Sequence, residues 1–312
     1  MNTEKKKKYD FLITGISGYI GINLSNYLLK NNFKVLGIDD FSNSERKNII
    51  RLKKKYKNLK FYNQSYDQIP KKILVDNVIH LAAKSSVEKK GDKINEYKSN
   101  NIIKLKKLLS SLKRIECKKF IFSSSAAVYK ETNLKISENF TCNPKSFYGK
   151  SKLIGEKLIK KLSKKKNVQF TILRFFNVIG GVTNYTKNSS VVTIWKNNLK
   201  KNKKLIVHDK GNCCRDFVDI NYILKVILKI SKNKKNYKYN LFNIGSGKST
   251  KLISLLNLFK KLSKKKINVK FENLPKNSIK ISMCNNKKII KFFKMRPQTK
   301  LKKIVETFIS KN

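Results

Sequence analysis

Short apolar runs alternate along this chain with longer segments in which apolar residues recur every three or four positions. Five of the runs predict buried strands, at residues 9–14, 34–38, 59–62, 75–81 and 119–123. Segments with the spacing of amphipathic helices separate them, notably residues 96–112 and a segment that opens at residue 148. Repeated strand and helix units predict an α/β fold with a doubly wound parallel sheet, whose carboxyl edge binds ligands.

A glycine-rich turn joins the first predicted strand to a helix that ends near Lys30. Its glycines, Gly15, Gly18 and Gly21, let backbone N–H groups approach a pyrophosphate at the positive end of that helix. The second strand ends at Asp39, about twenty residues downstream, where a carboxylate can accept from both hydroxyls of a ribose. An acid there repels a 2′-phosphate, so the pattern predicts NAD rather than NADP as the cofactor.

The last third of the chain alternates in the same way with shorter elements. Its pattern predicts helices at residues 218–230, 251–262 and 301–309, and strands at 240–244 and 267–271. We expect a Rossmann NAD-binding domain over residues 1–177 and a smaller C-terminal α/β region over residues 178–312. Some elements around residues 204–244 are expected to return to the Rossmann domain.

Tyr148 and Lys152 open the predicted helix that follows the fifth strand. Four residues separate them, so their side chains leave the same face of a helix one turn apart. A neighbouring ammonium favours the phenolate of a tyrosine, which can then accept a proton near neutral pH. The simpler alternative is a surface tyrosine and lysine at an ordinary helix start, so the pair gains weight only from the motifs around it.

Three strand ends carry polar side chains at the same edge, two of them on the predicted strands 75–81 and 119–123 and the third at Arg174. They are His80, the run from Ser123 to Ser125, and Asn177, which follows Arg174. His80 is more simply explained as a strand-end histidine with a local hydrogen bond than as a catalytic group. The serine run is either a polar strand exit or a substrate contact, and three hydroxyls at the cofactor edge favour the contact.

The chain is strongly basic, with a formal net charge of +54 over 312 residues. Only six of its 73 basic residues are arginines, whereas proteins that read nucleic acids rely on bidentate arginine contacts. We interpret the lysines as solvated faces that attract anionic ligands, and we expect no specific nucleic acid partner.

The cysteine pattern and the apolar runs suggest the compartment. Five cysteines without a repeating spacing predict neither a disulfide framework nor a zinc site, so we expect no metal and a reducing cytoplasm. No apolar run approaches the length of a membrane span, and we expect no membrane contact.

Taken in order, these motifs resemble the extended short-chain dehydrogenase/reductase superfamily. The motifs are the three glycines of the first turn, Asp39-Asp40 with Asn43-Ser44, Leu81-Ala82-Ala83-Lys84, Ser123 to Ser125, Tyr148 to Lys152, Arg174 to Asn177, and Arg215-Asp216-Phe217-Val218. Within the superfamily the chain is most similar to the NAD-dependent epimerase/dehydratase family, and in particular to its UDP-glucose 4-epimerase-like members.

The resemblance implies a role for each matching residue. Tyr148 is the implied base, Lys152 lowers its pKa, and Ser125 hydrogen-bonds the sugar oxygen that is oxidised. The implied cofactor contacts are Gly15, Gly18, Tyr19, Ile20, Gly21, Asp39, Asp40, Asn43, Ser44, Leu81, Ala82, Ala83, Lys84, Tyr148, Lys152 and Phe175. The implied substrate contacts are Ser125, Tyr148, Asn177, Arg215 and Lys276. For Arg215, the simpler alternative is a surface ion pair with Asp216.

The residues after Ser125 distinguish between reactions of this superfamily. Dehydratases typically have Asp-Glu there, but this chain has Ala126-Ala127 and therefore lacks the acid that eliminates water. The resemblance thus implies an NAD-dependent epimerase that inverts C4 of a UDP-hexose or UDP-N-acetylhexosamine through a 4-keto sugar. Dehydratases or reductases of the superfamily, and a non-catalytic polyanion-binding relative, stay open as alternatives.

Some positions depart from the family pattern. Ser65 stands where the family often has an aspartate near the adenine, and the small Ser282 at an aligned position predicts room for an N-acetyl group. The stretch from Gly245 to Thr250 resembles a phosphate-binding P-loop, but Phe242 replaces its first glycine. We expect there a turn that starts a helix capped near Ser249. Family practice also implies a homodimer through the helix that opens at Tyr148.

Overall fold

The computed structural model describes residues 7–70, 73–85, 94–112, 115–182, 189–263, 266–275 and 278–310. The chain divides into two compact units, and neither is one continuous stretch of sequence. The first unit combines Met1–Ser124, Lys150–Leu173 and Ile227–Leu241, and the second combines Ser125–Gly149, Arg174–Val226 and Phe242–Asn312. Lys276, a predicted substrate contact, lies outside the described residues.

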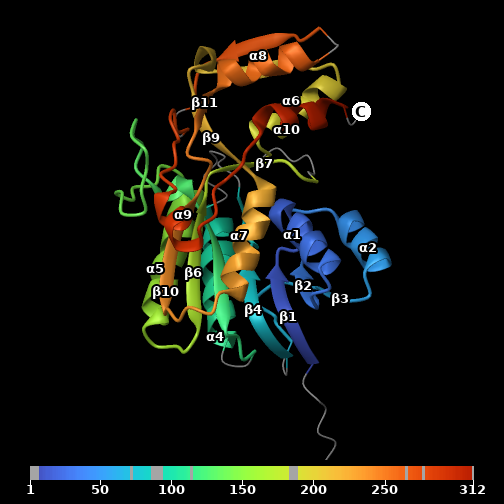
Figure 1. Cartoon of the computed structure of the whole chain (residues 1–312), viewed down its shortest axis with the longest axis vertical. Coiled ribbons are helices and arrows are strands. Elements are labelled where there is room, and N and C mark those ends of the chain that lie inside the picture. Colours follow the sequence, from blue (N-terminus) through green and yellow to red (C-terminus); the bar gives the residue numbers. More distant parts are fainter. Residues whose placement is uncertain are drawn as a thin grey trace, which may run out of the picture. The chain divides into compact units, whose positions relative to one another are not determined.

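A seven-stranded sheet with the order β10-β6-β5-β4-β1-β2-β3 is the centre of the first unit (Figure 1). Its strands are β1 (Lys7–Thr14), β2 (Val35–Asp39), β3 (Leu59–Asn63), β4 (Ile73–His80), β5 (Lys119–Ser125), β6 (Gln169–Phe175) and β10 (Tyr239–Ile244). The pairs of β1 with β2 and β4, of β2 with β3, and of β4 with β5 are parallel. The predicted doubly wound α/β fold is confirmed, and the predicted strands differ from these bounds by a few residues at most.

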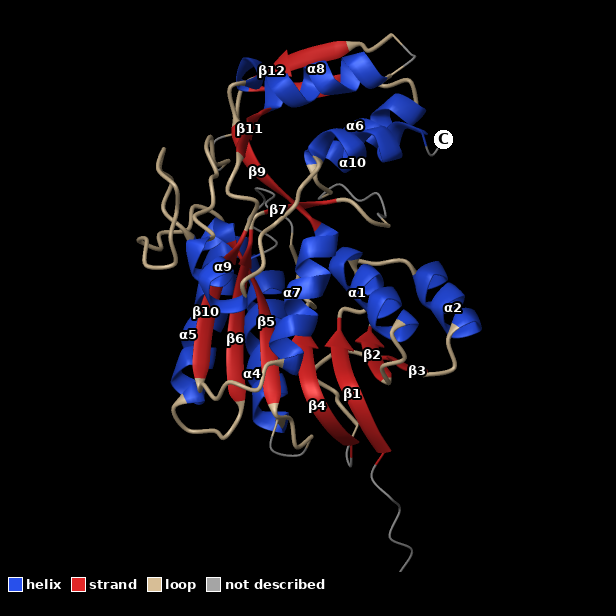
Figure 2. Ribbon diagram, viewed as in Figure 1, coloured by secondary structure: helices blue, strands red, loops and turns tan. Residues whose placement is uncertain are grey.

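Helices flank this sheet, as Figure 2 shows. They are α1 (Tyr19–Lys30), α2 (Arg46–Lys55), α3 (Ile94–Tyr97), the π-helical η2 (Lys98–Ile103), α4 (Lys104–Ser111), α5 (Phe147–Ser163) and α7 (Ile220–Lys232). Leu105 and Leu108 of α4 and Ile159 of α5 are buried in one cluster with Phe120 and Ile172 of the sheet. Burial of these apolar side chains stabilises the layered arrangement by roughly 1.5–3 kcal/mol for each large side chain.

The second unit contains two small sheets. One has the order β11-β9-β7, with β7 (Asn177–Ile179), β9 (Cys214–Asp219) and β11 (Ser249–Lys251), and the other pairs β8 (Leu205–His208) with β12 (Val269–Glu272). Its helices are α6 (Val191–Lys200), α8 (Leu252–Leu262), α9 (Lys287–Phe293) and α10 (Leu301–Ser310). Trp195 and Phe259 meet edge to face in its core, with ring centroids 5.4 Å apart.

Two predicted boundaries in this unit are wrong. The helix expected from residue 218 begins at Ile220, because Val218 belongs to β9 and pairs with Val178 of β7. The cap expected near Ser249 is absent, because Ser249 pairs with Asp216 in the antiparallel strand β11 and α8 begins only at Leu252. Apolar spacing could not separate these short strands from the helices that directly follow them.

Among the described residues, no helix has both the length and the apolar character needed to cross a membrane.

Candidate active site

The register of the sheet brings three loops together at its carboxyl edge. Thr14, the last residue of β1, lies opposite Ile38 of β2 and His80 of β4. The segments that begin at Gly15 and Leu81, and the residues that follow Asp39, therefore start side by side. Ligands bind at this edge in parallel sheets of this kind.

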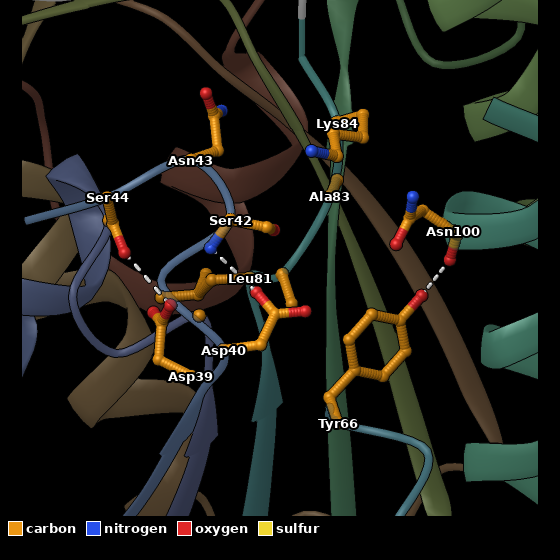
Figure 3. Close-up of a pocket in the computed structure, with 13 residues that line it drawn as sticks. Asp39, Asp40, Ser42, Asn43, Ser44, Tyr66, Leu81, Ala83, Lys84 and Asn100 are labelled. Carbon is orange, nitrogen blue, oxygen red and sulfur yellow. Dashed lines mark hydrogen bonds between the residues drawn. The ribbon is translucent and has the colours of Figure 1, made fainter. Parts of the chain in front are cut away.

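A pocket lies at this edge and is lined by residues of the first unit only (Figure 3). Its lining consists of Gly15, Gly18, Asp39, Asp40, Ser42, Asn43, Ser44, Tyr66, Leu81, Ala82, Ala83, Lys84 and Asn100. Ten of the thirteen are residues predicted to contact NAD. The three that were not predicted are Ser42, Tyr66 and Asn100. Tyr19 and Ile20, also predicted contacts, are the first residues of α1, and Phe175 is the buried last residue of β6.

Glycine is required in the turn that approaches this pocket. Gly15 has a φ of +72°, and a Cβ at that position would come within 2.7 Å of the Ala82 backbone nitrogen. A Cβ on Gly21, in the first turn of α1, would lie 2.2 Å from the carbonyl oxygen of Gly15. The backbone is thus packed as closely as a pyrophosphate site requires, and the residues present fit a bound dinucleotide.

Asp39 links the glycine turn to the pocket. Its Oδ2 accepts a hydrogen bond from the Ser17 backbone N–H at 2.8 Å, and its Oδ1 accepts from the Phe41 N–H and the Ser44 hydroxyl. Burial raises the pKa of the Asp39 carboxyl, and these three hydrogen bonds oppose that rise. A carboxylate offers about four acceptor sites, so Asp39 holds the turn and keeps acceptor capacity for a ribose hydroxyl.

Asp40 lies beside Asp39, as Figure 3 shows. Burial alone would raise the pKa of Asp40, but hydrogen bonds from Ser42 and the charges of Lys104 and Lys84 outweigh it and lower the pKa. The pocket therefore presents a second carboxylate together with the cation of Lys84. The backbone of Lys84 is fixed by the side chain of Asn101, which accepts from its N–H and donates to its carbonyl oxygen.

The buried lysine Lys152 lies on α5, one turn after Tyr148. Lys152 is 2% exposed, its Nζ donates to the carbonyl oxygen of Ser123 at 2.6 Å, and it lies 4.9 Å from the centre of the Phe122 ring. Burial lowers the pKa of the Lys152 ammonium to about 7, and the charge of Glu156 opposes that fall. The ammonium is therefore held at the sheet edge, and burial makes it easier to deprotonate.

Ser125 and the start of α5 both belong to the second unit, and a close contact connects them. The Ser125 hydroxyl accepts from the Ala127 N–H at 3.2 Å in the short 3₁₀ turn η3 (Ala126–Val128). A Cβ on Gly149 would lie only 2.3 Å from the carbonyl oxygen of Ala127. Glycine beside Tyr148 thus lets the first turn of α5 lie directly on the turn that follows Ser125.

His80 has the structural role that its simpler explanation gave it. Its ring is 2% exposed, its Nδ1 lies 2.7 Å from the Thr14 hydroxyl oxygen, and it stacks on Phe122 with ring centroids 5.7 Å apart. Burial, followed by the charge of Lys152, lowers the pKa of His80 well below its usual value. It is a neutral imidazole that fills the core beneath the sheet edge.

Asn177 and Arg215, two predicted substrate contacts, lie on the paired strands β7 and β9 of the second unit. Arg215 donates through Nη1 to the carbonyl oxygens of Cys214 and Lys280, at 2.9 and 3.0 Å. The Asn177 amide is half-buried and lies 3.4 Å from the carbonyl oxygen of Asp216. Both side chains are thus positioned by backbone contacts, and the structure brings them to the same small sheet.

The ion pair considered for Arg215 and Asp216 is wrong. The Asp216 carboxylate is fully buried and accepts instead from the backbone N–H groups of Ser246, Gly247 and Cys284, at 2.6, 2.9 and 3.0 Å, and from the Ser246 hydroxyl. These contacts also explain the P-loop-like stretch. The amides that would cradle a phosphate bind a carboxylate of the protein itself.

Of the pocket residues that were not predicted, Asn100 had a signal in the sequence. Tyr66 is buried and its hydroxyl donates to the carbonyl oxygen of Asn100, which lies in the π-helical turn η2 (Figure 3). Asn100 and Asn101 form a pair of adjacent amides within the predicted helix 96–112. Among the described residues, no group of histidine, cysteine or acidic side chains could hold a metal ion.

Comparison with known proteins agrees with this arrangement. A relative from Methanocaldococcus jannaschii, provisionally named a UDP-glucose 4-epimerase, is 31% identical over 80% of this chain and 81% of its own length. The UDP-glucose 4-epimerase of Mycoplasma genitalium is 27% identical over 80% of both chains. The crystal structure of UDP-glucuronic acid 4-epimerase from Bacillus cereus, in complex with UDP-glucuronic acid and NAD, is 26% identical. It covers 96% of this chain and 98% of its own, with a TM-score of 0.87.

The family comparison covers most of the chain. The sequence model of the NAD dependent epimerase/dehydratase family matches residues 11–245, which include the glycine turn, Asp39, Ser125, Tyr148, Lys152 and Arg215. The described parts of this range form the sheet and the pocket at its carboxyl edge. This chain belongs to the NAD dependent epimerase/dehydratase family.

Proposed function

We propose that this protein is an NAD-dependent nucleotide-sugar epimerase that inverts C4 of a UDP-hexose or UDP-N-acetylhexosamine. The observation that carries this proposal is the pair on α5, where Tyr148 lies one turn before a buried ammonium. Its relatives and solved structural neighbours named as UDP-sugar 4-epimerases support the reaction class. The pocket at the sheet edge supports NAD as the cofactor.

The chain's residues perform proton transfer and orientation in this reaction. Lys152 stabilises the phenolate of Tyr148, which takes the proton of the sugar C4 hydroxyl, while Ser125 hydrogen-bonds the same oxygen. NAD, when bound, supplies the hydride acceptor and returns the hydride to the sugar. After the 4-keto sugar turns over, C4 receives the hydride on its opposite face and Tyr148 returns the proton to the C4 oxygen. No net redox change results, because the two halves of the cycle reverse each other.

The residues after Ser125 disfavour a dehydratase. Ala126 and Ala127 occupy the 3₁₀ turn η3, where elimination of water would need a carboxyl group. The reductase alternative would consume or release nicotinamide cofactor in bulk. A nicotinamide absorbance that stays constant during turnover therefore distinguishes an epimerase from it.

We propose that Asn177, Arg215 and Lys276 face the nucleotide diphosphate. Guanidinium and amide donors suit phosphate oxygens, and the Nη1 contacts of Arg215 leave its remaining donors for them. Ser282 supports acceptance of N-acetylated sugars, because this small residue is 8% exposed and fixed through its backbone N–H to the Cys214 carbonyl oxygen. A larger side chain there would take the volume that an acetamido group needs.

The proposal is tested by incubating the purified protein with UDP-glucose, UDP-galactose, UDP-glucuronic acid and UDP-GlcNAc. Proton NMR of the anomeric and H4 signals then gives the stereochemistry of each product. We expect C4 inversion of at least one sugar without net formation of NADH. A protein that contains and binds NAD but inverts none of these sugars contradicts the proposed reaction.

NAD is expected to bind at least about tenfold more tightly than NADP. A 2′-phosphate would lie beside the carboxylates of Asp39 and Asp40, and a repulsion of about 1.4 kcal/mol gives a factor of ten. Titration calorimetry with both cofactors measures the ratio. Equal affinities would show that Lys84 and Lys104 cancel the two acids.

We also propose a homodimer and a cytoplasmic location. Ile103 at the end of η2 and Ile154 of α5 are large apolar side chains that are 44% and 40% exposed, as expected for helices that contact a second copy. All five cysteines are free thiols, which fits a reducing compartment. Sedimentation equilibrium of the protein and of an Ile154→Lys variant tests the dimer, which the added charge should weaken.

A further inference from the structure

A buried carboxylate lies on α5 one turn beyond Lys152. Glu156 follows Lys152 by four residues and Tyr148 by eight, so the three side chains leave the same side of the helix. Glu156 is 4% exposed, and the hydroxyl of Ser124 at the end of β5 donates to its Oε1. A glutamate this deeply buried is rare unless a cation accompanies it.

The buried basic residue one turn before Glu156 on α5 is Lys152, which is 2% exposed. Burial lowers the pKa of its ammonium, and Glu156 is the charged group that raises it again. His80, the titratable side chain that faces Lys152 from β4, is held neutral at neutral pH and adds no charge. Ser123 and Ser124 face the pair from β5 and do not titrate. Burial and the charge of Glu156 therefore act in opposite directions on the protonation of Lys152.

The base needs one specific arrangement of a shared proton. When Tyr148 and Lys152 hold one proton between them, either a phenolate lies beside an ammonium, or a phenol lies beside an amine. Both arrangements contain the same number of protons, so pH alone does not choose between them. The surrounding charges decide which one is populated.

The position of Glu156 favours the reactive arrangement. At 1.5 Å rise per residue, it lies about 6 Å along the helix axis from Lys152 and about 12 Å from Tyr148. A negative charge at these separations stabilises the nearby ammonium more than it destabilises the distant phenolate. The proton is therefore drawn to the lysine, and the tyrosine stays ionised.

We propose that Glu156 is a positioning residue for the reaction, because its charge keeps the shared proton on Lys152 and so keeps Tyr148 in its basic form. The inference rests on the proposed role of Tyr148 and Lys152. It assigns the buried Ser124–Glu156 contact a purpose beyond packing. The essential property is the charge of Glu156, and the hydrogen bond from Ser124 holds the carboxylate in place.

The test is the ionisation of Tyr148 in the NAD-loaded protein. Phenolate absorbance is recorded against pH as the ultraviolet difference between each variant and the same variant carrying Tyr148→Phe, so that the other twelve tyrosines cancel. Glu156→Gln keeps an acceptor oxygen for Ser124 and removes the charge. We expect it to move the phenolate midpoint upward by about one pH unit or more. The rising limb of kcat against pH should move with it, while KM stays within a factor of about two.

Ser124→Ala is the matched control, because it removes the hydrogen bond and keeps the charge. It should shift the midpoint clearly less than Glu156→Gln. If the glutamine variant does not fold, Glu156→Met removes the same charge from the same volume and is expected to give the same shift.

Three results would overturn the inference. They are an unchanged midpoint in the variants without the charge, an equal shift in Ser124→Ala, or no phenolate in the parent below the range of ordinary tyrosines. Failure of the proposed epimerase function would give a different result from failure of this inference. In that case no sugar is inverted by any variant, and the phenolate titration still decides the role of Glu156.

Discussion

Replacing Tyr148 by phenylalanine is expected to lower kcat for sugar inversion by about a hundredfold to ten-thousandfold. The substitution removes the hydroxyl that we propose accepts and returns the C4 proton, and it leaves the first turn of α5 in place beside η3. Because phenylalanine keeps the aromatic ring and lacks only the hydroxyl, the variant should still bind NAD and the nucleotide sugar. Inversion measured by NMR, together with calorimetric titration of both ligands, separates the chemical step from binding.

Tyr56→Phe is the matched control for this result. Its hydroxyl donates only to the Asn26 side chain at an exposed position, 3.0 Å away, and that residue has no part in the site. The control should invert sugars at the rate of the parent. A Tyr148→Phe protein as active as the control would exclude Tyr148 as the base and would leave the proposed mechanism without its proton acceptor.

Replacing Asp216 by asparagine is expected to cost about 2–6 kcal/mol of unfolding free energy. The carboxylate accepts four hydrogen bonds in a fully buried position, and the amide of asparagine can replace only one of its two oxygens as an acceptor. Two donors then face an N–H₂ group, and each buried donor left without an acceptor costs about 1–3 kcal/mol. Denaturant unfolding followed by circular dichroism measures the loss.

Asp219→Asn is the control on the same strand. Asp219 accepts one hydrogen bond, from the Asn221 N–H at 2.8 Å, and an asparagine oxygen can accept it equally well. Its cost should stay below about 1 kcal/mol. If both substitutions cost the same, the buried contacts of Asp216 contribute no more to stability than an ordinary helix start.

The sheet and the cofactor edge could be predicted from the sequence because both depend on local signals. Gly15 must adopt a positive φ beside Ala82, and Asp39 ends a strand that is buried on both sides. Both requirements are local, so the type and spacing of these residues in the sequence predict this part of the fold. Tyr148 and Lys152 share a helix face, which a spacing of four also fixes. These features require no knowledge of distant contacts.

The features that the sequence did not reveal depend on long-range pairing. Ser249 belongs to a strand because it pairs with Asp216, 33 positions earlier. No local sequence pattern indicates that partner. The acceptor role of Asp216 toward Cys284 spans 68 positions in the same way. Helix α2 was not predicted, because it has only three buried residues, Asn48, Ile49 and Leu52. The lysines around them leave too few apolar positions to show a helical spacing.

The strand order of the large sheet has a consequence for folding during synthesis on the ribosome. The edge strand β10 comes from residues Tyr239–Ile244, although its neighbour β6 is complete at Phe175. In a nascent chain, the edge of β6 that pairs with β10 therefore lacks its partner strand while more than sixty further residues are synthesised. Unpaired strand edges are sites of aggregation, so this interval is when a chaperone would be most useful.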